Sequence, residues 1–91
     1  MAIKKGTLKN GFKFAIEEDV LDDVELMEDM AMAQGEDPLR VVQVIKKVLG
    51  EEQKERLYNH VRTDDGRVPT SVVSECLTEM FELIGETGKN S

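Results

Sequence analysis

The sequence predicts a mainly α-helical fold, a small four-helix domain preceded by a short N-terminal β-hairpin. Three observations lead to this prediction. Only residues 3–16 carry a strand signal, four later segments repeat apolar side chains at helical spacing, and 91 residues suffice for one modest core. We therefore expect a single domain with a hairpin or extended arm at 1–16, a helical core at 19–84 and a frayed tail at 85–91.

The hairpin prediction depends on a turn and on the strand that follows it. Phe12, Phe14 and Ile16 alternate with polar or small residues, as half-buried strands do. The Asn-Gly pair at 10–11 favours a tight turn. A two-residue turn would place Leu8 on the opposite face from the phenylalanines, and a longer loop would repair this register. Because a lone hairpin is only marginally stable in water, we expect its apolar face to lie on the helices or on another subunit.

The first helix is expected from Val20 to Ala33, with Asp19 as its N-cap and Gly35 as its stop. At helical spacing, four apolar side chains form one stripe: Val20, Val24, Met27 and Ala31. Three more widen the stripe on one flank: Leu26, Met30 and Ala33.

Three further helices are expected. The second follows the Asp-Pro pair at 37–38 and ends at Gly50, and apolar residues cover well over half of its circumference. They leave one polar strip: Arg40, Gln43 and Lys47. This pattern is typical of a central helix. The third helix, at 51–62, has only a narrow apolar stripe, whereas the fourth, at 69–84, has the most regular apolar period of the chain.

The net charge of −7 is unevenly distributed. Residues 1–16 hold four lysines and no acid, and residues 17–37 hold ten acids and no base. The acidic block would repel phosphates, so we expect no nucleic-acid partner. No apolar stretch approaches the ~20 residues of a membrane span, so we expect no membrane partner. Alternating blocks of charge suit self-association or a basic partner, and the simpler alternative is that they are solvated helix faces.

Side chains that carry catalysis or bind metals do not cluster in the sequence. His60 is the only histidine and lies on the charged side of its helix, and Cys76 lies on an apolar stripe, where cysteine behaves as a small hydrophobe. The segment after Val61 superficially resembles a calcium loop, but Val61 and Val72 stand where the loop needs carboxylates. We therefore expect no enzyme activity, no cofactor and no bound metal.

Partner binding is the function class that remains. Met27, Met30 and Met32 lie on the acidic helix, and methionine both fills cores and makes adaptable binding surfaces. Met32 and Leu21 point away from the apolar stripe, and a domain this small cannot easily cover both sides of that helix. Core filling is the alternative. The candidate partner-binding residues are all apolar: Leu21, Leu26, Met27, Met30, Met32, Phe12 and Phe14.

Three stretches resemble one known family. They are GFKFAIEEDVLDDVEL at 11–26, KVLGEEQKERLY at 47–58 and RTDDGRVP at 62–69. These stretches are similar to the tail assembly chaperones of long-tailed phages and prophages of Gram-positive bacteria. The resemblance covers nearly the whole chain after about Phe12 and contains no catalytic motif.

The resemblance implies a non-enzymatic role in tail assembly. Such chaperones bind the tape-measure protein while tail-tube subunits polymerise around it. The implied partners are therefore the tape-measure protein, the tail-tube protein and further copies of the chain, in the cytoplasm of the bacterial host and not in the mature virion. A tape measure is a long helical chain whose apolar stripes aggregate until the tube covers them. The alternative is a small acidic adaptor or inhibitor that binds a regulatory protein, possibly by mimicking the charge of DNA.

Overall fold

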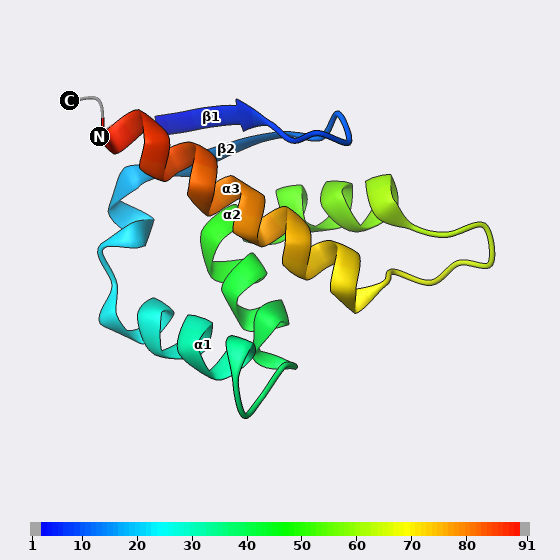
Figure 1. Cartoon of the computed structure of the whole chain (residues 1–91). Helices are drawn as coiled ribbons and strands as arrows, with labels where there is room; N and C mark the ends of the chain where they lie inside the picture. Colours follow the sequence, from blue (N-terminus) through cyan, green and yellow to red (C-terminus); the bar gives the residue numbers. More distant parts are fainter. Residues whose placement is uncertain (1–2, 90–91) are drawn as a thin grey trace.

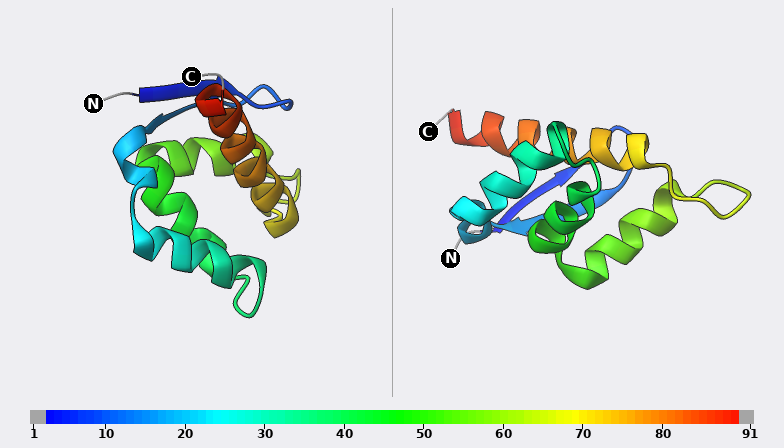
Figure 2. Two further views of the ribbon diagram at one scale, coloured as in Figure 1. Left: turned by 60° about the vertical axis from the view of Figure 1, so that its left-hand side comes forward. Right: turned by 90° about the horizontal axis from the view of Figure 1, so that it is seen from below.

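The computed structural model describes residues 3–89, with side chains from 3 to 84, and these residues form an antiparallel hairpin followed by three α-helices (Figures 1 and 2). The elements in chain order are β1 (Ile3–Thr7), β2 (Lys13–Glu17), the short 3-10 helix η1 (Glu18–Leu21), α1 (Val24–Gln34), α2 (Arg40–Val61) and α3 (Thr70–Lys89). α3 crosses α2 and contacts the hairpin, whereas α1 packs on the first half of α2, away from the hairpin.

The prediction of four helices is wrong, because the described residues form three. The expected helices at 38–50 and 51–62 belong to one element, α2, which bends sharply at Gly50. Gly50 has φ 80° and ψ 168°, a conformation that is essentially restricted to glycine. The wide apolar face of the first half gives way to a narrow one at this residue, and the sequence pattern therefore indicated an end where the chain makes a bend.

The N-terminal hairpin is present, and its loop is longer than the Asn-Gly pair. Thr7 pairs with Lys13, which leaves a five-residue loop between the strands. Inside this loop the Leu8 N–H donates to the Phe12 carbonyl at 2.8 Å. The extra length brings Leu8 onto the same buried side as Phe12 and Phe14, as the apolar pattern requires.

The apolar face of the hairpin packs on the helices of its own chain. The Phe14 ring lies over Gly6, where a Cβ atom would come within 2.7 Å of the ring. On the outer edge of β2, Gln53 of α2 donates to the Ala15 carbonyl at 2.7 Å and accepts from the Ala15 N–H at 2.8 Å. This side chain satisfies the edge of β2 as a neighbouring strand would.

The ends of two helices differ from the prediction. α1 begins after Asp23, whose carboxylate accepts from the Glu25 N–H at 2.9 Å, whereas the expected N-cap, Asp19, lies in η1. Several acids precede the helix, and each has the chemistry of an N-cap. α3 continues to Lys89, beyond the expected end at Ile84, and the last two residues of the expected tail lie outside the described part of the chain.

The side of α1 that packs on the core is not the side that carries its main apolar stripe. Leu26 and Asp29 are buried, whereas Val24 and Met27 are 71% and 60% exposed. The stripe that contains Val24, Met27 and Ala31 therefore faces solvent, and the flank that contains Leu26 packs inward. This orientation places Asp29 against α2.

The bend in α2 is testable at Gly50. Open space surrounds the site of a Cβ atom there, so the cost of Gly50→Ala comes from its backbone angles alone. We expect a loss of about 1–3 kcal/mol in the free energy of unfolding, measured by urea denaturation. Gln43→Ala, at an exposed and regular position of the same helix, should stay within about 0.5 kcal/mol of the wild type. Equal stabilities for the two variants would contradict the bend.

Candidate functional site

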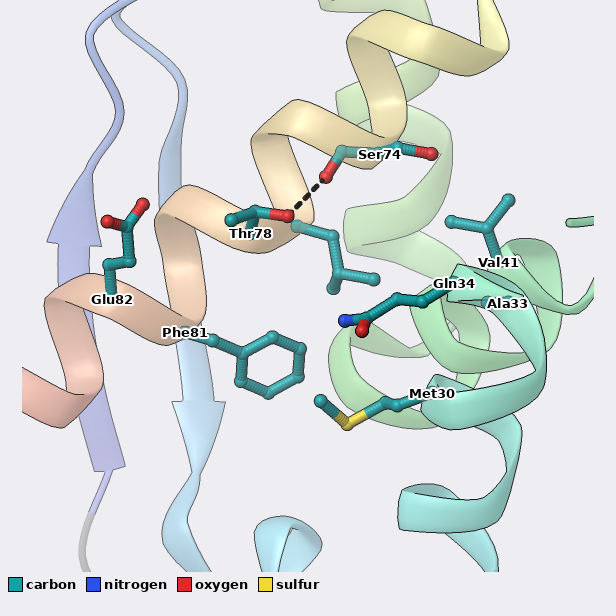
Figure 3. A pocket seen from close by; sticks show the side chains of 9 residues that line it. Met30, Ala33, Gln34, Val41, Ser74, Thr78, Phe81 and Glu82 are labelled. Atoms are coloured by element: carbon teal, nitrogen blue, oxygen red, sulfur yellow. Dashed lines mark hydrogen bonds between the residues drawn. The ribbon is translucent and has the colours of Figure 1, made fainter.

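An apolar groove with a volume of about 400 Å³ opens between α1 and α3 (Figure 3). Three residues of α1 line one wall: Met30, Ala33 and Gln34. Five residues of α3 line the other: Ser74, Leu77, Thr78, Phe81 and Glu82. Val41 of α2 also lines it. The volume lies within the ~300–1,000 Å³ range of protein binding clefts.

The side chains in the groove combine an apolar centre with a polar border. Phe81 and Met30 face each other across it, and the Gln34 amide lies beside them (Figure 3). The hydroxyl of Thr78 donates to the Ser74 carbonyl at 3.1 Å, so it is occupied within its own helix. An apolar centre with a polar rim is the arrangement of protein-binding surfaces.

A smaller apolar hollow lies elsewhere on the helices. It measures about 190 Å³ and lies between α2 and the start of α3. Val41, which is buried, is the one lining residue that the two hollows share. At the rim of the second hollow, Leu39 is 77% exposed and Val42 is also exposed.

One buried carboxylate holds the groove wall formed by α1. Asp29 accepts from Arg40 Nη1 at 2.6 Å and from Lys47 Nζ at 2.9 Å, and both bases are on α2. The hydrogen bond from Lys47, followed by that from Arg40, lowers the pKa of Asp29. These two bases belong to the polar strip predicted for this helix. The carboxylate thus fixes one side of α1 to α2 and leaves the neighbouring side facing the groove.

The structure separates the seven candidate partner-binding residues into three groups. Phe12, Phe14 and Leu26 are buried in the core and offer no surface to a partner in this fold. Leu21 and Met32 are half-buried, and Leu21 packs against the core.

The remaining two candidates lie near or in the groove. Met30 is half-buried and lines it, and Met27 is exposed one helical turn earlier on α1. Sequence reasoning missed Phe81 and Leu77, because both lie on the stripe of the last helix that was expected to form the core. The sequence did contain a sign of this exposure: the apolar stripe of the last helix is wide, and Phe81 lies at its edge. In the structure Phe81 is only half-buried.

His60 and Cys76 both contact the hairpin loop. His60 Nε2 lies 2.9 Å from the Asn10 carbonyl oxygen, and its ring contacts that of Phe12 with the centroids 5.7 Å apart. Cys76 is buried and its Sγ accepts from Asn10 Nδ2 at 3.5 Å. Burial raises the pKa of the Cys76 thiol, which disfavours a nucleophilic thiolate. These contacts hold the loop on the helices.

Neither a metal site nor a membrane-spanning helix is present in the described part of the chain. Among the side chains of residues 3–84, no group of three or more His, Cys, Asp and Glu is placed to hold a metal ion. No helix within residues 3–89 has the length and apolar character needed to cross a membrane. No known family model, curated protein or solved structure matches the chain.

The role of Asp29 is testable by its effect on pH-dependent stability. Because its pKa is lowered in the folded chain, its contacts stabilise the fold above about pH 4 and are lost as the pH falls through the folded value. We expect Asp29→Asn to lower the urea midpoint at pH 7 and to weaken its decline between about pH 5 and pH 2. Glu28→Gln, the exposed neighbour, is the control. Equal pH profiles for Asp29→Asn and the wild type would refute this role.

Proposed function

We propose that this protein is a non-enzymatic tail assembly chaperone of a long-tailed phage. In this role it binds the tape-measure protein and keeps it soluble while tail-tube subunits polymerise. The resemblance of residues 11–26, 47–58 and 62–69 to that family supports the proposal. The observation that carries it is the open apolar groove between α1 and α3, which contains Met30 and Phe81.

The area that the chain leaves exposed supports a binding role. Its accessible surface is 6173 Å², whereas a compact monomer of 10.2 kDa exposes about 5,300 Å². The chain therefore exposes more surface than an average compact monomer of its mass. The groove offers an apolar contact, and the flexible Met30 side chain would adapt to different partner side chains.

The charges around the groove suit a protein that keeps an aggregating partner in solution. Most carboxylates of the acidic block at 17–37 are exposed, whereas Asp29 is buried and paired. A partner held in the groove would therefore be surrounded by negative charge, which opposes association between complexes. In this proposal the groove makes the apolar contact with the partner, and the acidic block keeps the complex soluble.

A second exposed surface supports the proposed self-association. Val24 and Met27 lie on the solvent side of α1, together with Ala31. This stripe is distinct from the groove wall formed by Met30 and Gln34. An oligomer that buries this stripe leaves the groove open for the tape measure.

Co-expression tests the proposed function. The tape-measure protein of the same phage should move from the insoluble to the soluble fraction when it is produced with this chain, and the two should co-purify. An unrelated acidic protein of similar size is the control for a general charge effect. The complex should persist in about 1 M salt, where charges are screened within about 3 Å and a complex based on charge mimicry would dissociate. An insoluble tape measure beside a folded, soluble chain would contradict the proposal.

A further inference from the structure

We infer that the outer edge of β1 binds an extended acidic segment of another protein, which adds a third strand to the hairpin. This edge is separate from the groove, and binding there is an activity beyond the proposed function. Three features of the hairpin support it: the direction of the backbone groups in β1, the exposure of the edge residues and the placement of two lysines.

The two outer edges of the hairpin differ. On β2, Gln53 bonds to both the N–H and the carbonyl of Ala15, so these groups point away from β1. Lys5 lies opposite Ala15 in the antiparallel register, and in such a pair the backbone groups of both residues point outward. Because this direction alternates along a strand, Ile3 and Thr7 also direct their N–H and carbonyl groups away from β2. The outer edge of β1 therefore presents the backbone groups of every second residue.

The backbone groups at this edge have no partner within the described part of the chain. Ile3, Lys5 and Thr7 are all exposed. No hydrogen bond from another described segment reaches their N–H or carbonyl groups, and the sheet has no third strand. Edge groups of this kind are the template on which an extended peptide adds a strand.

Two lysines give this edge a positive charge. Lys4 and Lys5 are adjacent in β1, so their side chains lie on opposite faces of the sheet. Neither forms a salt bridge within the described part of the chain. Glu17, the one acid of the two strands, lies opposite Ile3 and pairs with neither lysine. An added strand with two adjacent carboxylates would place one carboxylate opposite each lysine.

Ile3 adds an apolar position to this recognition. Its side chain is exposed and lies on the same face as that of Lys5, two residues away. In an antiparallel added strand, the residue that follows the two acids would lie opposite Ile3, which favours an apolar side chain there. The segment that fits the edge is thus extended and contains two adjacent acids followed by an apolar residue.

A second copy of the chain fits this edge less well. Symmetric antiparallel pairing that uses all three outward residues would place Lys5 directly opposite the partner's Lys5, and like charges in this position destabilise a sheet. A shift of register that separates the lysines leaves Ile3 without a partner residue. Lysines on an edge strand oppose pairing between copies, and the same charges favour an acidic strand.

Two peptides of about ten residues test the inference. Both alternate threonine and valine, and one contains two adjacent glutamates followed by valine where the other contains two lysines. Binding to the full chain is measured by fluorescence anisotropy. We expect the glutamate peptide to bind at least about tenfold more tightly, although the net charge of −7 favours the lysine peptide. Equal affinity for the two peptides, or no binding of either, would overturn the inference.

Amide hydrogen exchange, followed by NMR, locates the bound peptide. The outward N–H groups of Lys5 and Thr7 should exchange rapidly in the free chain and at least about tenfold more slowly with saturating glutamate peptide. The N–H groups of Lys4 and Gly6 point towards β2 and are the internal reference, which should change little. Unchanged exchange at Lys5 and Thr7 in the presence of the peptide would overturn the assignment to this edge.

Two pairs of variants separate the backbone contribution from that of charge. Thr7→Pro removes an outward N–H that β2 does not use and should weaken the glutamate peptide about tenfold, whereas Thr7→Ala should not change it. Lys5→Glu should weaken the same peptide about tenfold, and Lys13→Glu, an equal change of charge on β2, should weaken it less than about threefold. The Lys5 and Lys13 variants keep the test valid if Thr7→Pro fails to fold. Equal effects within a pair would overturn the inference.

Light scattering tests the alternative occupant. If the wild type is a dimer that Thr7→Pro converts to a monomer, a second copy occupies the edge and the inference is wrong. If Thr7→Pro and the wild type have the same mass and only the wild type binds the glutamate peptide, the edge is free for the acidic segment.

Discussion

The contact between Asp29 and the two bases of α2 determines how α1 is placed, and the groove depends on that placement. A carboxylate among apolar neighbours is costly to bury without partners, so the side of α1 that carries it must face Arg40 and Lys47. This requirement directs Leu26 inward and directs the Val24 and Met27 side of the helix to solvent. The remaining side of α1 faces α3 across a hollow.

The groove and the acidic surface have complementary roles in the proposed chaperone. A chain of 91 residues has little core to spare, and its buried side chains are shared between the hairpin, α2 and α3. Closing the groove would require α1 to shift towards α3 and to strain the contacts of Asp29. The groove is therefore open in this packing, and under the proposed function the tape-measure protein would supply apolar contacts to it.

Local signals in the sequence predicted the hairpin and a break in the helical pattern at Gly50. They did not predict the orientation of α1, because a helical period shows that two sides are apolar but not which side the rest of the chain covers. Asp29 looks like its acidic neighbours in the sequence, and only its contact with bases 11 and 18 residues away distinguishes it. The groove was also missed, since Met30 and Phe81 come from helices that are far apart in the sequence.

The accessibility of the methionine methyl groups tests most directly whether the groove is open in solution. The chain is labelled with ¹³C at the methionine methyls, and a soluble nitroxide is added while the NMR signals are recorded. Met80 is fully buried, so its signal is an internal reference for complete protection. An open groove predicts strong attenuation of the Met27 and Met30 signals with Met80 unaffected. A Met30 signal as protected as that of Met80 would show that α1 and α3 close on each other, and would contradict the groove as the proposed binding site.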